Sequence, residues 1–137
     1  MLRKRLAIPL AVAVAGTSVV VAGILRADAT EAPAGCGVSY GVVAQWNPGF
    51  TANLRLRNAG SAPIAGWALG FALPADQRVE GGWSGHWSQS GATVTVRDTG
   101  WNRTIARGGA VSIGFNGSWR GSNPPPTAFT LNGMACD

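Results

Sequence analysis

Hydrophobic and polar residues alternate with a period of two in short segments of this chain. In the segment 51–57, Ala52, Leu54 and Leu56 share one phase, and Asn53 and two arginines fill the other. This period is typical of a β-strand with one buried and one solvated face. We therefore predict a strand over 51–57 with Asn53 directed outward.

Three later segments show the same alternation. The segment 67–73 places its large apolar residues in one phase, which predicts Trp67 as a core residue. The segments 92–97 and 111–115 alternate in the same way. In the segment 111–115 the polar phase, which contains Ser112 and Gly114, continues to Asn116. We therefore place Asn116 on a polar face.

Turn-forming residues separate these segments, and helix signals are nearly absent after residue 30. A last predicted strand, 127–131, ends at the dipeptide 132–133, Asn-Gly, which is typical of tight turns. The prolines at 124–126 favour a stiff loop before it. Short strands punctuated by turns predict an all-β fold, an antiparallel β-sandwich.

The N-terminus has the pattern of an export signal. Basic residues at 3–5 precede an apolar run over 6–25, and the small-x-small sequence at 27–29 is typical of a cleavage site. We predict a signal peptide over residues 1–29. The apolar run is also about as long as a membrane-spanning helix, so an uncleaved anchor is the alternative.

The rest of the chain is long enough for one domain and too short for two. Residues 30–35 are predicted to be a linker stub, and residues 36–137 the folded module. We expect a secreted, extracellular, monomeric product that does not contact a membrane once the signal is removed.

The two cysteines lie at the extremes of this module. An even cysteine count in an exported chain predicts one disulfide, here Cys36 to Cys136. Closing a loop of about 100 residues stabilises the fold by roughly 4.7 kcal/mol in the chain-entropy model. We assign both cysteines a structural role and neither a metal or redox role.

The net charge of +5 depends largely on the N-terminal segment. From residue 30 onward the chain has seven arginines, no lysine and five acidic residues, so its net charge is near +2. No basic cluster remains in this region. A nucleic-acid partner is therefore not expected.

Few residues could support catalysis. Glycoside hydrolysis usually needs two carboxylates across the scissile bond. The nearest acidic pair is Asp76 and Glu80, which we place around a turn as solvated surface acids. His86 is the only histidine, so a multi-histidine metal site is excluded, and we predict a surface or loop position for it. We expect no enzyme activity, no metal and no cofactor.

Three tryptophans lie beside glycine, asparagine and serine in segments that resemble turns: Trp46, Trp83 and Trp101. Turns lie at the surface, where a large flat ring is available to stack on a ligand. A pyranose has apolar C–H faces and a rim of hydroxyl groups, so aromatic rings can cover the face while amides bind the rim. This combination predicts a sugar-binding surface.

Several motifs give the chain a family resemblance from about residue 36 to 136. The motifs are Gln45-Trp46, Gly49-Phe50-Thr51-Ala52-Asn53, Gly66-Trp67, Gln89-Ser90-Gly91, Gly114-Phe115-Asn116-Gly117-Ser118 and 126–133. With these motifs in this order, the chain resembles the family 2 carbohydrate-binding modules, the bacterial cellulose-binding domains of secreted glycosidases.

The resemblance implies an immunoglobulin-like β-sandwich with three coplanar tryptophans on one face. By motif these are Trp46, Trp83 and Trp101, with Asn53 and Asn116 as polar residues flanking them. Having all three tryptophans is more similar to the cellulose-binding subtype than to the xylan-binding one. We expect sandwich packing for Trp87 and leave the role of Trp119 open.

Some positions depart from the family pattern. Relatives often have Asn or Gln where this chain has Ala44 and Gly81, and Ser112 replaces a frequent Gln. Fewer amide hydrogen bonds should weaken binding modestly if stacking dominates.

The predicted function is that of a secreted, non-catalytic module that adsorbs to insoluble polysaccharide, crystalline cellulose first. Chitin or xylan binding is the alternative within the same class. A surface-anchored protein-interaction domain, using the same apolar strip, is the alternative from a different class. No catalytic domain is expected, because the chain ends at Asp137.

Overall fold

A computed structural model describes residues 35–137, and every regular element in this range is a β-strand. The predicted signal peptide and most of the linker stub lie outside the described residues. The strands are β1 (Cys36–Gln45), β2 (Gly49–Asn58), β3 (Ile64–Ala65), β4 (Ala68–Ala72), β5 (Asp76–Trp83), β6 (His86–Ser90), β7 (Thr93–Arg97), β8 (Thr104–Ile105), β9 (Ala110–Arg120), β10 (Phe129–Leu131) and β11 (Met134–Ala135).

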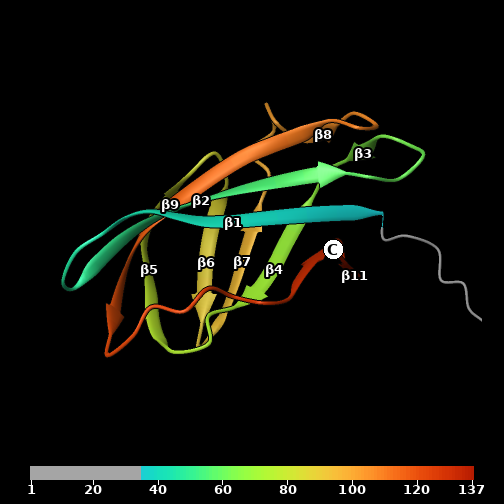
Figure 1. The fold of residues 1–137 in the computed structure, drawn as a ribbon. Helices are drawn as coiled ribbons and strands as arrows, with labels where there is room; N and C mark the ends of the chain where they lie inside the picture. The colour runs from blue at the N-terminus through green and yellow to red at the C-terminus, as the bar shows by residue number, and fades with distance from the viewer. Residues whose placement is uncertain (1–34) are drawn as a thin grey trace, which may run out of the picture. The chain divides into compact units, whose positions relative to one another are not determined.

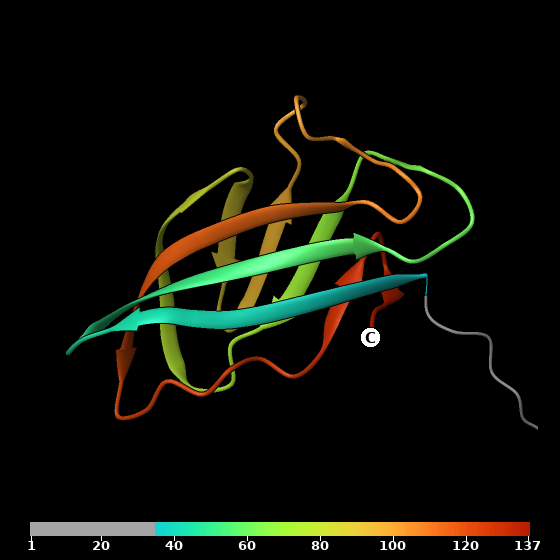
Figure 2. The same ribbon diagram turned by 45° about the horizontal axis from the view of Figure 1, so that its top comes forward.

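Two antiparallel sheets form the body of the domain. One has the strand order β1-β2-β9-β5 and the other β11-β10-β4-β7-β6, and β3 and β8 form a small separate pair. Figure 1 shows the long strands of the first sheet crossing those of the second, and Figure 2 shows the two layers after rotation. The predicted antiparallel β-sandwich is confirmed.

The segments with clean alternation all contain strands. The segment 51–57 lies in β2, 67–73 spans β4, 92–97 spans β7, and 111–115 lies in β9. Trp67 is 3% exposed, as predicted for a core residue.

The predicted turn around Asp76 and Glu80 is wrong. Both residues lie in β5, which ends at Trp83 and pairs with β9. Polar residues and the Gly81-Gly82 dipeptide favour a turn locally, but pairing with a long neighbouring strand holds the segment extended.

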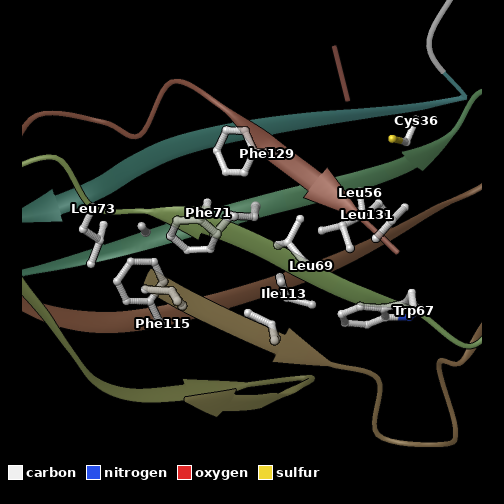
Figure 3. Packing of buried hydrophobic residues seen from close by; sticks show 14 of the residues in the cluster. Cys36, Leu56, Trp67, Leu69, Phe71, Leu73, Ile113, Phe115, Phe129 and Leu131 are labelled. Carbon is white, nitrogen blue, oxygen red and sulfur yellow. The ribbon is translucent and has the colours of Figure 1, made fainter. Parts of the chain in front are cut away.

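The core fills the space between the two sheets. Figure 3 shows Phe71, Phe115 and Phe129 gathered between the layers, with Trp67 at one end. Phe115 packs edge to face against Phe50, with ring centroids 5.4 Å apart. The buried residues that share this cluster include Leu54, Leu56, Leu69, Leu73, Val94, Val96, Ile113 and Leu131.

The predicted disulfide between Cys36 and Cys136 is present, with the two Cα atoms 4.8 Å apart. Backbone hydrogen bonds reinforce the same junction. The N–H of Val38 donates to the carbonyl of Asp137 at 2.9 Å, and the N–H of Asp137 donates to the carbonyl of Cys36 at 3.0 Å. The end of the module is therefore held against the start of β1.

Tyr40 on β1 is the one tyrosine of the chain and lies half-buried beside Phe115 and Phe129. Its hydroxyl oxygen is buried, and within residues 35–137 it has no hydrogen-bond partner. Burial disfavours the charged phenolate and raises the pKa of Tyr40 to about 12.

Raising the pH should therefore destabilise the domain above the ordinary tyrosine pKa of 10.0. Below that pH, Tyr40 is protonated in both states and contributes no pH dependence. Between pH 10 and pH 12 the unfolded state loses its proton first, so the free energy of unfolding should fall. Tyrosinate absorbance, followed in native and urea-unfolded protein, measures both pKa values at this single residue.

Tyr40→Phe provides the control. Because the hydroxyl makes no hydrogen bond, its removal should change the free energy of unfolding at neutral pH by less than about 1 kcal/mol. The variant should also lose most of the decline above pH 10. A native Tyr40 pKa equal to that in urea would contradict the burial of the hydroxyl.

Candidate functional site

The outward face of the β1-β2-β9-β5 sheet has the side chains of four predicted site residues: Trp46, Trp83, Asn53 and Asn116. Antiparallel pairing aligns its residues in rows that cross the sheet. One row contains Gly41, Asn53, Gly114 and Trp83. The next contains Ala44, Thr51, Asn116 and Gly81.

Trp46 lies in the turn between β1 and β2, and its side chain is 50% exposed. Its indole covers Gly49, where a Cβ atom would lie only 2.5 Å from the indole Cε2. Gly49 is in the same strand phase as Thr51 and Asn53. The Trp46 ring therefore lies over the outward face.

Trp83, at the end of β5, is 42% exposed. Its indole lies over Gly114 of β9, and a Cβ atom at Gly114 would collide with the ring. The same Cβ would lie 2.8 Å from the Oδ1 atom of Asn53. Trp83 and Asn53 are thus neighbours above one glycine.

Trp46 and Trp83 therefore share one face, and the strand register sets their spacing. Gly49 is four residues from Asn53 on β2, and Asn53 pairs with Gly114 below the Trp83 ring. At about 3.3 Å per residue, the two rings are separated by roughly 13 Å along the strand direction.

Trp101 is the most exposed of the three rings, at 77%, and lies in the loop after β7. In Figure 2 this loop projects beyond the strands. Asp98 holds the first residues of this loop. The Asp98 carboxylate accepts hydrogen bonds from the backbone N–H of Trp67 at 3.0 Å and from that of Gly100 at 3.1 Å. The hydrogen bond from the backbone N–H of Trp67 is the largest cause of the lowered pKa of the Asp98 carboxyl.

The loop of Trp101 is also bonded to the turn after Trp83. The Nδ2 atom of Asn102 donates to the carbonyl of Ser84 at 2.7 Å. Trp101 and Trp83 therefore come from segments that lie side by side.

The two predicted asparagines are both exposed on this face. Asn116 accepts a hydrogen bond of 2.7 Å from the hydroxyl of Thr51, its cross-strand partner. This bond orients the Asn116 amide, whose N–H groups can donate to a ligand.

Trp87 and Trp119 both pack against the core, which confirms the expectation for Trp87. The ring centroids of Trp87 and Phe115 lie 5.0 Å apart. Trp119 on β9 supports the Trp46 turn, because its Nε1–H donates to the carbonyls of Trp46 at 2.9 Å and Gly49 at 3.1 Å. Trp119 is thus a supporting residue for Trp46.

The sequence pattern did not predict that supporting role, nor the packing of the rings on glycines. A signal for the glycines was present in the sequence: Gly49 and Gly114 fall in the outward phase of alternating strands, where a side chain would ordinarily lie.

The ionisable groups are dispersed over the surface. The Arg120 Nε lies 3.4 Å from the Asp76 carboxylate, and Glu80 accepts a bond of 2.9 Å from the Ser118 hydroxyl. His86 is exposed at the start of β6. Among residues 35–137, no three His, Cys, Asp or Glu side chains are grouped to hold a metal ion. The described part of the chain also contains no helix long and apolar enough to cross a membrane.

Comparison with protein families matches residues 36–136 to the cellulose binding domain model. This chain belongs to that family. The resemblance to family 2 carbohydrate-binding modules is therefore confirmed, and residues 36–136 form a cellulose binding domain of the kind found as non-catalytic modules in enzymes.

Individual proteins show the same relationship. Exoglucanase A of Cellulomonas fimi is 52% identical over 102 residues, which are 74% of this chain and 12% of that protein. A solved chitin-binding domain from Streptomyces coelicolor is 32% identical with a TM-score of 0.62, covering 74% of this chain and 94% of that one. A solved cellulose-binding family 2 domain is 27% identical with a TM-score of 0.57, covering 77% and 97%.

Adding one methyl group beneath Trp83 should displace its ring from the face of this cellulose binding domain. Gly114→Ala places a Cβ where the indole now lies, and overpacking of this kind costs about 1–3 kcal/mol. Thermal unfolding would measure the cost, and the indole N–H resonance of Trp83 would report the displacement.

Gly81→Ala is the matched control, since Gly81 lies two strand positions from Trp83 and a Cβ there meets no atom within 4 Å. It should leave the Trp83 resonance in place. Equal shifts in the two variants would contradict the packing of Trp83 on Gly114.

Proposed function

We propose that this domain is a secreted, non-catalytic module that adsorbs to crystalline cellulose through Trp46, Trp83 and Trp101. Asn53 and Asn116 would bind the hydroxyl rim of the same chains. The observation that carries the proposal is the packing of Trp46 and Trp83 over glycines on a single sheet face. A binding face whose rings are held against a sheet suits a flat polymer surface better than a cleft-shaped binding site would.

The aromatic rings and amides of the face support a sugar ligand. Its exposed aromatic rings can cover pyranose C–H faces, and its asparagine amides can donate to or accept from hydroxyl groups. The acids Asp76 and Glu80 instead contact Arg120 and Ser118. These contacts support binding without cleavage.

The proposed setting of the module is extracellular and monomeric. We assign residues 1–29 to a signal peptide, 30–35 to a linker stub and 36–137 to the module. The relatives named exoglucanase support export, because an insoluble polymer can be reached only outside the cell. The disulfide between Cys36 and Cys136 suits an oxidising compartment.

Chitin is the second candidate ligand, and one observation favours it. The solved domain from Streptomyces coelicolor is named as chitin-binding and shares 32% identity with this chain. Cellulose and chitin both present pyranose faces to aromatic rings, so the two ligands must be separated by direct measurement.

Replacing all three tryptophans with alanine should abolish adsorption to microcrystalline cellulose. Exposed tryptophans that dominate an interface typically contribute 2 kcal/mol or more each, and about 1.4 kcal/mol corresponds to a tenfold change in affinity. Each single substitution should therefore weaken adsorption about tenfold or more. Depletion of protein from the supernatant measures this directly.

Met134→Ala is the control for loss of exposed apolar surface elsewhere, because Met134 on β11 is 44% exposed. It should adsorb like the unaltered protein. Parallel assays with chitin and xylan identify the preferred polymer. Undiminished cellulose adsorption by the triple variant would refute the assigned site. If the unaltered protein adsorbs to chitin and not to cellulose, chitin replaces cellulose as the proposed ligand.

A further inference from the structure

The side chain of Asn102 connects the loop of Trp101 to the turn that follows Trp83. Asn102 is 6% exposed, although the neighbouring Trp101 is 77% exposed. Its Nδ2 atom donates to the carbonyl of Ser84 at 2.7 Å. Its Oδ1 atom accepts the backbone N–H and the hydroxyl of Thr99, each at 3.0 Å. One amide thus bonds both segments.

The receiving turn has an unusual backbone conformation at the same point. Ser84 has a φ of 61°, in the left-handed region that residues other than glycine rarely adopt. Such a conformation persists only where the surrounding structure holds it. The bond from Asn102 to the Ser84 carbonyl is one interaction that holds it.

The backbone of Asn102 is tied to the core as well. The Nε1–H of Trp67 donates to the carbonyl of Asn102 at 2.9 Å, and Trp67 is 3% exposed. Asp98 bonds the other side of the loop to the backbone of Trp67 at 3.0 Å. The loop that presents Trp101 is therefore attached to the sandwich on both sides of the ring.

We propose that Asn102 is a positioning residue for the polysaccharide site. It holds the Trp101 loop against the Ser84 turn, so that the rings of Trp101 and Trp83 are presented in a fixed relative position before binding. The inference rests on the proposed function, because it concerns the same proposed binding site. A preordered pair of rings loses less conformational freedom on binding than two independent ones.

Asn102→Asp tests this directly. The substitution keeps the size of the side chain and an oxygen for Thr99, but it replaces the N–H donor with a carboxylate oxygen facing the Ser84 carbonyl. The order parameter of the Trp101 indole N–H should fall, while that of Trp46 stays unchanged. Adsorption to microcrystalline cellulose should weaken by about tenfold.

A double-mutant cycle separates positioning from general destabilisation. In a Trp101→Ala background, Asn102→Asp should cause little further loss of adsorption, because the ring it positions is absent. An equal loss in both backgrounds would overturn the proposal, as would an unchanged Trp101 order parameter. If wild-type protein does not adsorb, the proposed function fails, and with it the positioning role.

Asn132→Asp is the matched control. Asn132 also donates from Nδ2 to a backbone carbonyl, that of Gly66 at 3.0 Å, and accepts the N–H of Ala68 at 2.8 Å. It should leave both adsorption and the Trp101 order parameter unchanged. If Asn102→Asp does not fold, Asn102→Ser is the second variant, since a serine keeps a short oxygen near Thr99 but cannot reach Ser84.

Discussion

Pairing of β9 with both β2 and β5 is the constraint on which the domain and its candidate site depend. Because side chains alternate along a strand, this pairing directs Ile113 and Phe115 into the core and Gly114 and Asn116 onto the outward face. A slip of one residue would expose Phe115 and bury Asn116. The hydrophobic core therefore sets the register of the face as well as the stability of the sandwich.

Glycine makes that face suitable for flat rings. Trp46 and Trp83 pack on Gly49 and Gly114, where any side chain would lift the indole from the backbone. A ring that packs on the sheet keeps one side covered and leaves the other available. Since its orientation is already restricted, little conformational freedom remains to be lost when a rigid surface binds.

The turns and loops that contain the tryptophans are stabilised by neutral hydrogen bonds and one carboxylate. Trp119 bonds the turn of Trp46, Asp98 bonds the first residues of the Trp101 loop, and Asn102 bonds that loop to Ser84. Strand pairing thus defines the plane of the face, and side-chain bonds to the backbone hold the Trp46 turn and the Trp101 loop. These features are consistent with the proposed binding of an uncharged, extended polymer.

The sequence by itself determined the features that depend on short spacing: the alternating strands, the outward phase of Asn53 and Asn116, the core position of Trp67, and the pairing of the only two cysteines. It did not predict β5, because its glycines and acids favour a turn until β9 pairs with them. Only the tertiary structure placed Gly114 under Trp83, Trp119 behind Trp46 and Asn102 against Ser84. Each of these contacts joins residues far apart in the chain, and such contacts follow from strand register and loop placement, which local periodicity does not encode.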